Sequence, residues 1–123
     1  MQLASGYEAE VERGPNWLFV RLRCDEAADG AALLCDELSA LMQRHSARRM
    51  VVELDGLACV DDETARQIAR LFDQVTGDGG LLRVSGATAA AQEKLTKAQG
   101  DGAVPCYATR HDAVLGHRPH QPR

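Results

Sequence analysis

The feature that most constrains the fold is a regular alternation of short apolar runs with helix-length amphipathic segments. Two strand-like runs at 7–12 and 17–24 come first. Apolar runs at 50–54, 81–84 and 104–107 follow, separated by segments long enough for helices. Strands joined by such long connections run parallel, because only a crossover returns the chain to the same end of the sheet. The order β-β-α-β-α-β-α-β therefore predicts an α/β fold with a mixed, mostly parallel sheet of about five strands.

The two opening runs are each apolar at every second residue, which is the pattern of a half-buried strand. In 7–12 the intervening residues are all glutamate, and in 17–24 they include two arginines. The Gly-Pro-Asn sequence at 14–16 favours a turn. We therefore expect the two runs to form an antiparallel hairpin.

The later segments carry apolar residues at the three- and four-residue spacing of one helix face. Polar residues that cap the free N–H groups of a first helical turn precede them. The expected helices run from a cap at Asp29 to about His45, from Asp61 to a stop at 78–80, from a cap at Thr88 to Gln99, and as a closing turn from Asp112.

A chain of 123 residues has room for one compact domain and little more. We expect the domain to span 7–116, after an N-terminal tail at 1–6. The last residues, 117–123, contain two prolines and are expected to form a disordered tail.

The charge of the chain argues against nucleic acid as a partner. The net charge is −4, whereas duplex binding needs a concentrated positive surface. Cations favour the negative end of a helix dipole. We therefore interpret the one basic cluster as a solvated helix end, and it consists of Arg44, His45, Arg48 and Arg49.

The sequence favours a cytoplasmic location. No run approaches the ~20 apolar residues of a membrane span, so we expect no direct membrane insertion. Residues 1–6 lack the basic and apolar regions of a signal peptide. The four cysteines form no CxxC pair and lie in or beside apolar segments. They are expected to be buried thiols in a reducing compartment rather than disulfides or zinc ligands.

The segment with the strongest functional signal is 57–64, which follows the strand at 50–54. Ligands and partners of open α/β sheets dock at the carboxyl ends of the strands. An ordinary structural explanation also exists, because one acid caps the helix and further acids favour the positive end of its dipole. The helix here begins with Asp61, Asp62, Glu63 and Thr64.

The span from about Tyr7 to Leu115 resembles the STAS family, the fold of bacterial anti-sigma factor antagonists. In that family a strand leads into a loop of the type Phe-Met-Asp-Ser-Ser-Gly, which opens the next helix. Its first serine is phosphorylated by a partner kinase that is also the anti-sigma factor. The resemblance implies a STAS-like domain with helices packed mainly on one side of the sheet and a protein partner. The corresponding residues here are Cys59-Val60-Asp61-Asp62-Glu63-Thr64, with the next strand start at 79–84.

This chain departs from the family at the phosphorylation site. Asp62 stands in place of the phosphorylatable serine, Glu63 in place of the second serine, and Thr64 in place of the glycine. Either Asp62 imitates the phosphorylated state with a permanent charge, or the chain belongs to a branch that never used the switch. We favour the second interpretation. Phosphorylation of Thr64 is a weaker alternative to an ordinary structural role.

A second acidic loop replaces the Gly-Glu-Leu-Asp-like stretch that family members carry before their first helix. The family aspartate of that loop corresponds to Ala27. We expect loops 24–29 and 57–63 to lie at the same end of the sheet, where their acids favour a basic partner surface. The predicted partner-binding residues are Asp25, Glu26, Asp61, Asp62, Glu63 and Thr64.

No catalytic residues are predicted. Consecutive acids at a helix start point in different directions, and the sequence has no GxSxG, Gly-rich phosphate loop or HExxH motif. A hard cation held by Asp25, Asp61 and Asp62 is a weaker alternative. We therefore expect a non-catalytic module without cofactor or metal.

Three kinds of binding module fit these observations. The first is an anti-sigma factor antagonist that engages an anti-sigma factor of the serine kinase type, and we favour it although the serine is missing. The second is an accessory subunit of a membrane ABC transporter for lipids. The third is a structural subunit of a STAS assembly or a homodimer. The sequence does not separate the three.

Overall fold

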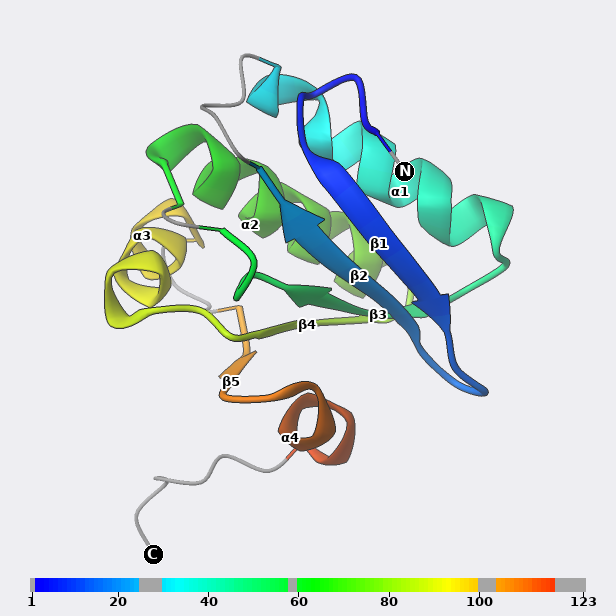
Figure 1. The fold of residues 1–123 in the computed structure, drawn as a ribbon. Helices are drawn as coiled ribbons and strands as arrows, with labels where there is room; N and C mark the ends of the chain where they lie inside the picture. The colour runs from blue at the N-terminus through cyan, green and yellow to red at the C-terminus, as the bar shows by residue number, and fades with distance from the viewer. Residues whose placement is uncertain (1, 25–29, 58–59, 100–103, 117–123) are drawn as a thin grey trace, which may run out of the picture.

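The computed structural model describes residues 2–24, 30–57, 60–99 and 104–116. They form a sheet with helices against it (Figure 1). The strands are β1 (Glu8–Arg13), β2 (Leu18–Arg23), β3 (Arg49–Glu53), β4 (Leu81–Ser85) and β5 (Cys106–Tyr107). The helices are the short 3₁₀ turn η1 (Ala31–Leu33), α1 (Leu34–Arg44), α2 (Asp62–Gly77), α3 (Ala89–Gln99) and α4 (Arg110–Leu115).

The order of the strands across the sheet follows the chain, β1-β2-β3-β4-β5. β1 pairs with β2 antiparallel through the predicted hairpin, and every later pair is parallel. The mixed, mostly parallel sheet and the strand–helix order predicted from the sequence are therefore confirmed. Strand ends differ from the predictions by one or two residues, which reflects how weakly pattern alone defines an element boundary.

The main core lies between the sheet and the helices α1, α2 and α3, which Figure 1 shows on the far side of the strands. Side chains of β3 are buried on both faces of the sheet, as expected of a central strand. Met50 and Val52 point into this core, Val51 joins the opposite face, and all three are fully buried. A strand covered on both faces reads as a continuous apolar run, which is the pattern found at 50–54.

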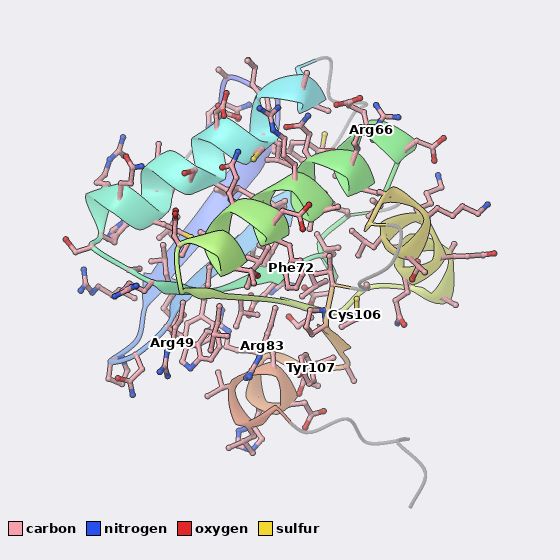
Figure 2. The ribbon with its side chains drawn as sticks, turned by 180° about the vertical axis from the view of Figure 1, so that it is seen from behind. Arg49, Arg66, Phe72, Arg83, Cys106 and Tyr107 are labelled. Atoms are coloured by element: carbon pink, nitrogen blue, oxygen red, sulfur yellow. The ribbon has the colours of Figure 1, made fainter. Side chains whose placement is uncertain are left out.

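The opposite face of the sheet carries a smaller cluster that α4 covers. Trp17 and Phe19 from β2 and its approach pack there with Tyr107 and with Ala113 of α4. Figure 2 shows Tyr107 and Arg83 beside α4, on the side of the sheet away from α1 and α2. The prediction that the helices lie mainly on one side is confirmed, with α4 as the exception.

Two residues of the segment 1–6, which the sequence analysis expected to be an N-terminal tail, are buried against the domain. Leu3 belongs to the main core and Ser5 is fully buried. The backbone N–H of Gly30 donates to the carbonyl of Ser5 at 3.1 Å. A Cβ on Gly30 would lie 2.9 Å from the Ser5 Cα, so glycine is what permits this close approach. The predicted tail 117–123 lies outside the described residues.

The helix caps were predicted with mixed success. The Thr88 hydroxyl accepts from the Ala91 N–H at 3.1 Å, as expected for a cap. α4 starts earlier than the predicted turn from Asp112, because Thr109 is its cap and accepts from the Asp112 N–H at 3.1 Å. α1 begins at Leu34 after η1, and the predicted cap Asp29 lies outside the described residues.

Candidate protein-interaction site at the start of α2

The carboxyl ends of β2 and β3 meet at one edge of the sheet, as their parallel register requires. Near these ends, Arg21 of β2 and Asp55, just after β3, form an ion pair of 3.0 Å. Further along the chain lie Val60, which is buried, and Asp61, which caps α2. The start of α2 therefore lies at the edge where partners of α/β domains dock.

Asp61 is the N-cap of α2, as the sequence predicted. Its backbone is extended, with φ −84° and ψ 174°, and its Oδ1 accepts from the Thr64 N–H at 2.7 Å. The hydrogen bonds from Thr64 hold the pKa of the Asp61 carboxyl below its ordinary value, because they favour the ionised form. This carboxylate is committed to the helix, so its main role is structural.

Thr64 is fully buried, unlike Asp61, Asp62 and Glu63. Its hydroxyl is hydrogen-bonded to the hydroxyl of Tyr7 on the approach to β1. The pair joins α2 to the first strand inside the core. Thr64 lies on the face of α2 that also turns Ala65 and Ile68 into the core, so its hydroxyl is not accessible in this conformation.

Asp62 has the opposite environment. Its side chain is 84% exposed, and its nearest cation is Lys94 of α3, with an Oδ1–Nζ distance of 3.7 Å. An exposed ion pair at that distance stabilises the fold by well under about 1 kcal/mol. As an acid in the first turn of α2, Asp62 also favours the helix dipole, by about 0.3–1 kcal/mol. It is therefore an exposed charge that contributes little to the stability of the domain.

Glu63 is intermediate in exposure between Thr64, which is buried, and Asp62, which is exposed. It forms an ion pair with Arg66 and accepts from the Gln67 side-chain amide at 2.8 Å. Gln67 is buried, and its Oε1 accepts from the Cys35 N–H at 3.1 Å. Glu63 thus supports a link between α2 and α1 while part of its carboxylate stays exposed.

Cations that the sequence reasoning missed surround Asp62. A hollow of about 460 Å³ between α2 and α3 is lined by Asp62, Arg66, Lys94, Lys97 and Ala98. The predicted acidic surface is therefore of mixed charge on its α3 side. The signal was present in the sequence, since Arg66 follows Asp62 by four residues and Lys97 follows Lys94 by three, which places each pair on one helix face. Figure 2 shows Arg66 near the start of α2.

The remaining predicted residues of this site, Asp25 and Glu26, lie outside the described residues, as does Cys59. Across the part of the chain that is described, no three residues of the kinds that bind metals gather in one place. None of the described helices has the length and apolar character needed to cross a membrane.

No family model and no curated protein matches the sequence, whereas solved structures match the fold. The matching structures include anti-sigma factor antagonists. The chain has the fold of a STAS domain, an α/β module with a mixed sheet.

Three of these structures illustrate the range. Moorella thermoacetica RsbS, in a variant with serine replaced by glutamate, has a TM-score of 0.71 at 14% identity, over 88% of this chain and 92% of that one. The anti-sigma factor antagonist SpoIIAA in its unphosphorylated form has a TM-score of 0.63 at 11% identity, over 89% of this chain and 96% of that one. SLC26A9 has a TM-score of 0.65 at 13% identity, over 82% of this chain and 19% of that one.

Proposed function

We propose that this domain is a non-catalytic regulatory module that binds a protein partner through the exposed start of α2, in the manner of an anti-sigma factor antagonist. Cytoplasmic location is part of this proposal. The interaction surface consists of Asp62, the exposed part of Glu63, and the flanking cations Arg66, Lys94 and Lys97.

The observation that carries the proposal is the environment of Asp62. Asp62 is 84% exposed at the docking edge of the sheet, and its ion pair and its place at the helix start each add less than about 1 kcal/mol to folding. Asp61 and Thr64, its neighbours, are by contrast used within the domain. An exposed side chain at this edge that the fold does not use for a cap or a core contact is suited to contact another molecule.

We propose further that binding is not switched by phosphorylation at this position. Asp62 offers no hydroxyl, and the Thr64 hydroxyl is buried against Tyr7. A carboxylate carries a charge of −1, against about −1.5 to −2 for a phosphoserine. The charge of the surface around Asp62 and Lys94 is therefore not changed by phosphorylation.

The experiment is affinity capture from the native cell with three baits, the wild type, Asp62→Arg and Asp73→Arg. Asp73 is an exposed acid on the same helix, about 16 Å from Asp62 along the axis, and so is a matched control. We expect the wild type and Asp73→Arg to retain one shared partner that Asp62→Arg loses. Retention of all partners by a folded Asp62→Arg domain would contradict the proposed surface.

The identity of the lost partner separates the candidate functions. A soluble ATPase related to histidine kinases would support anti-sigma factor antagonism. The similarity to part of SLC26A9 favours a second candidate, in which the domain is an accessory subunit of a membrane transporter such as an ABC lipid transporter. Capture of a transporter ATPase with its permease would support that candidate. Capture of copies of this chain alone would support a homodimer or a STAS assembly.

A further inference from the structure

Three arginines from two segments that are far apart in the sequence lie together at the end of the sheet opposite to the start of α2. Arg13 ends β1, Arg48 precedes β3, and Arg49 begins β3. Together they line one hollow. Arg48 and Arg49 belong to the basic cluster that we interpreted from the sequence as a solvated helix end, whereas Arg44 and His45 of that cluster do not line the hollow and Arg13 does.

Two of these arginines are held in place by neutral groups. Arg13 donates from Nη1 to the backbone carbonyl of His45. Arg48 donates from Nη2 to the backbone carbonyl of Asp78 at 2.9 Å. A guanidinium has five N–H donors, so each side chain is positioned by one bond and keeps further donors for a ligand. A carbonyl partner also leaves the positive charge uncompensated.

Among the described residues, none of Arg13, Arg48 and Arg49 forms an ion pair with a carboxylate. Arginines elsewhere in the domain do so. Arg23 pairs with Glu10 at 2.7 Å, and Arg110 pairs with Glu12 at 3.0 Å. The chain as a whole has a net charge of −4, so a local concentration of unpaired cations is not a consequence of its composition.

The hollow has the shape and lining of a small-anion site. Its volume is about 190 Å³, enough for several waters at ~30 Å³ each. Residues 13–17 of the hairpin form one wall and residues 46–49 form the other. Trp17 is one of the lining residues, and the Arg49 guanidinium lies 5.9 Å from the centre of its ring. Figure 2 shows Arg49 at this end of the sheet, away from Arg66.

We propose that this hollow, which we call the arginine hollow, binds a phosphate oxyanion, either as inorganic phosphate or as a small phosphomonoester. Arginine is the side chain best matched to phosphate, because its planar fork donates two parallel hydrogen bonds to two oxygens. Arg13 and Arg48 approach from opposite walls and supply the donors, and Arg49 adds charge beside the indole. The site is independent of the proposed partner surface, which lies at the other end of the strands.

Trp17 provides the assay, because it is the single tryptophan of the chain and lines the hollow. Indole fluorescence is followed during titration with sodium phosphate, and separately with methyl phosphate, at ionic strength held constant with chloride. We expect a saturable change with phosphate. A response to methyl phosphate as well would assign the site to monoesters, and a response to phosphate alone would assign it to the free anion.

The variants Arg48→Gln and Arg13→Gln are each expected to raise the dissociation constant for phosphate roughly ten-fold or more, because each removes a charge-assisted hydrogen bond. Arg23→Gln is the matched control, an exposed arginine at the other end of β2, and should titrate like the wild type. Circular dichroism confirms that each variant is folded. The absence of a saturable response in the wild type would overturn the proposal. Equal affinity in folded Arg48→Gln and Arg13→Gln would also do so.

Discussion

Replacing Asp61 tests how the start of α2 is built. Asp61→Ala removes the oxygen that accepts from the Thr64 N–H at 2.7 Å and the charge at the positive end of the helix dipole. Loss of a cap costs about 1 kcal/mol, and loss of the charge about 0.3–1 kcal/mol. We expect the free energy of unfolding to fall by about 1–2 kcal/mol. In a domain of this size the melting temperature should fall by about 4–8 °C.

The pH dependence of this effect follows from the lowered pKa of Asp61. A carboxyl whose pKa is lower in the folded state stabilises the fold when it is ionised. Its contribution is complete above the ordinary pKa, which is 3.8, and is lost as the pH falls through the lower folded value. The difference between wild type and Asp61→Ala should therefore be largest near pH 7 and shrink on acidification below about pH 4.

Urea denaturation at several pH values, followed by circular dichroism, measures this difference. Asp61→Asn serves as the control, since asparagine is as good a cap but carries no charge. It should lose only the smaller, electrostatic part, about 0.3–1 kcal/mol. Equal stability of Asp61→Ala and wild type at pH 7 would show that Asp61 does not stabilise α2, as would a difference that grows in acid.

Two further stability predictions concern buried polar pairs. The Glu53 side chain is 7% exposed and is bound by Arg110 of α4, with Nη2–Oε1 at 2.9 Å. Arg110→Ala leaves that carboxylate buried without its cation, and thermal unfolding should show a loss of about 2–3 kcal/mol, reduced from the fully buried case because Arg110 is 37% exposed. A loss below about 0.5 kcal/mol would show that α4 is not held by this pair. Tyr7→Phe should cost about 1–2 kcal/mol, because the buried Thr64 hydroxyl loses a partner. Tyr7→Phe combined with Thr64→Val should cost less than the two single changes added together, and simple additivity in urea denaturation would contradict a direct hydrogen bond between them.

The fold was predictable because its signal is repeated along the chain. The continuous apolar run at 50–54 and the alternation at 7–12 each specify how many faces of a strand are covered, and the helix-length connections require parallel pairing. The cap at Asp61 was predictable for the same reason, since its evidence is local. Thr109 was missed as the cap of α4 because a six-residue helix has too short an apolar period to mark its start.

The place of the candidate surface in the fold was predictable, but the burial and the charge of its residues were not. The carboxyl edge of β3 follows from topology, so Asp62 was placed correctly at an exposed helix start. Burial of Thr64 depends on the partner it meets across the core, Tyr7, 57 residues away. Lys94 and Lys97 share a hollow with Asp62 only because α3 packs beside α2. The local sequence pattern gives no information on that packing.

Contacts on the face of the sheet that α4 covers were likewise not predictable from local sequence patterns. Leu81 to Tyr107 was expected to add two strands, and it does. The arginine contacts on that face were not expected. Arg83 lies over the Trp17 ring at 5.1 Å and donates to the Ala113 carbonyl of α4 at 2.7 Å. These contacts join residues from three separate segments, which periodicity along one segment cannot reveal.

The most direct test of the central claim is hydrogen–deuterium exchange of the domain with and without its captured partner. We expect slower exchange in the first turns of α2, at 62–67, and in the facing part of α3, at 92–97. Exchange at the 46–49 end of the sheet should not change. Protection confined to α1, to β1 or to that opposite end, with 62–67 unchanged, would contradict binding through the start of α2.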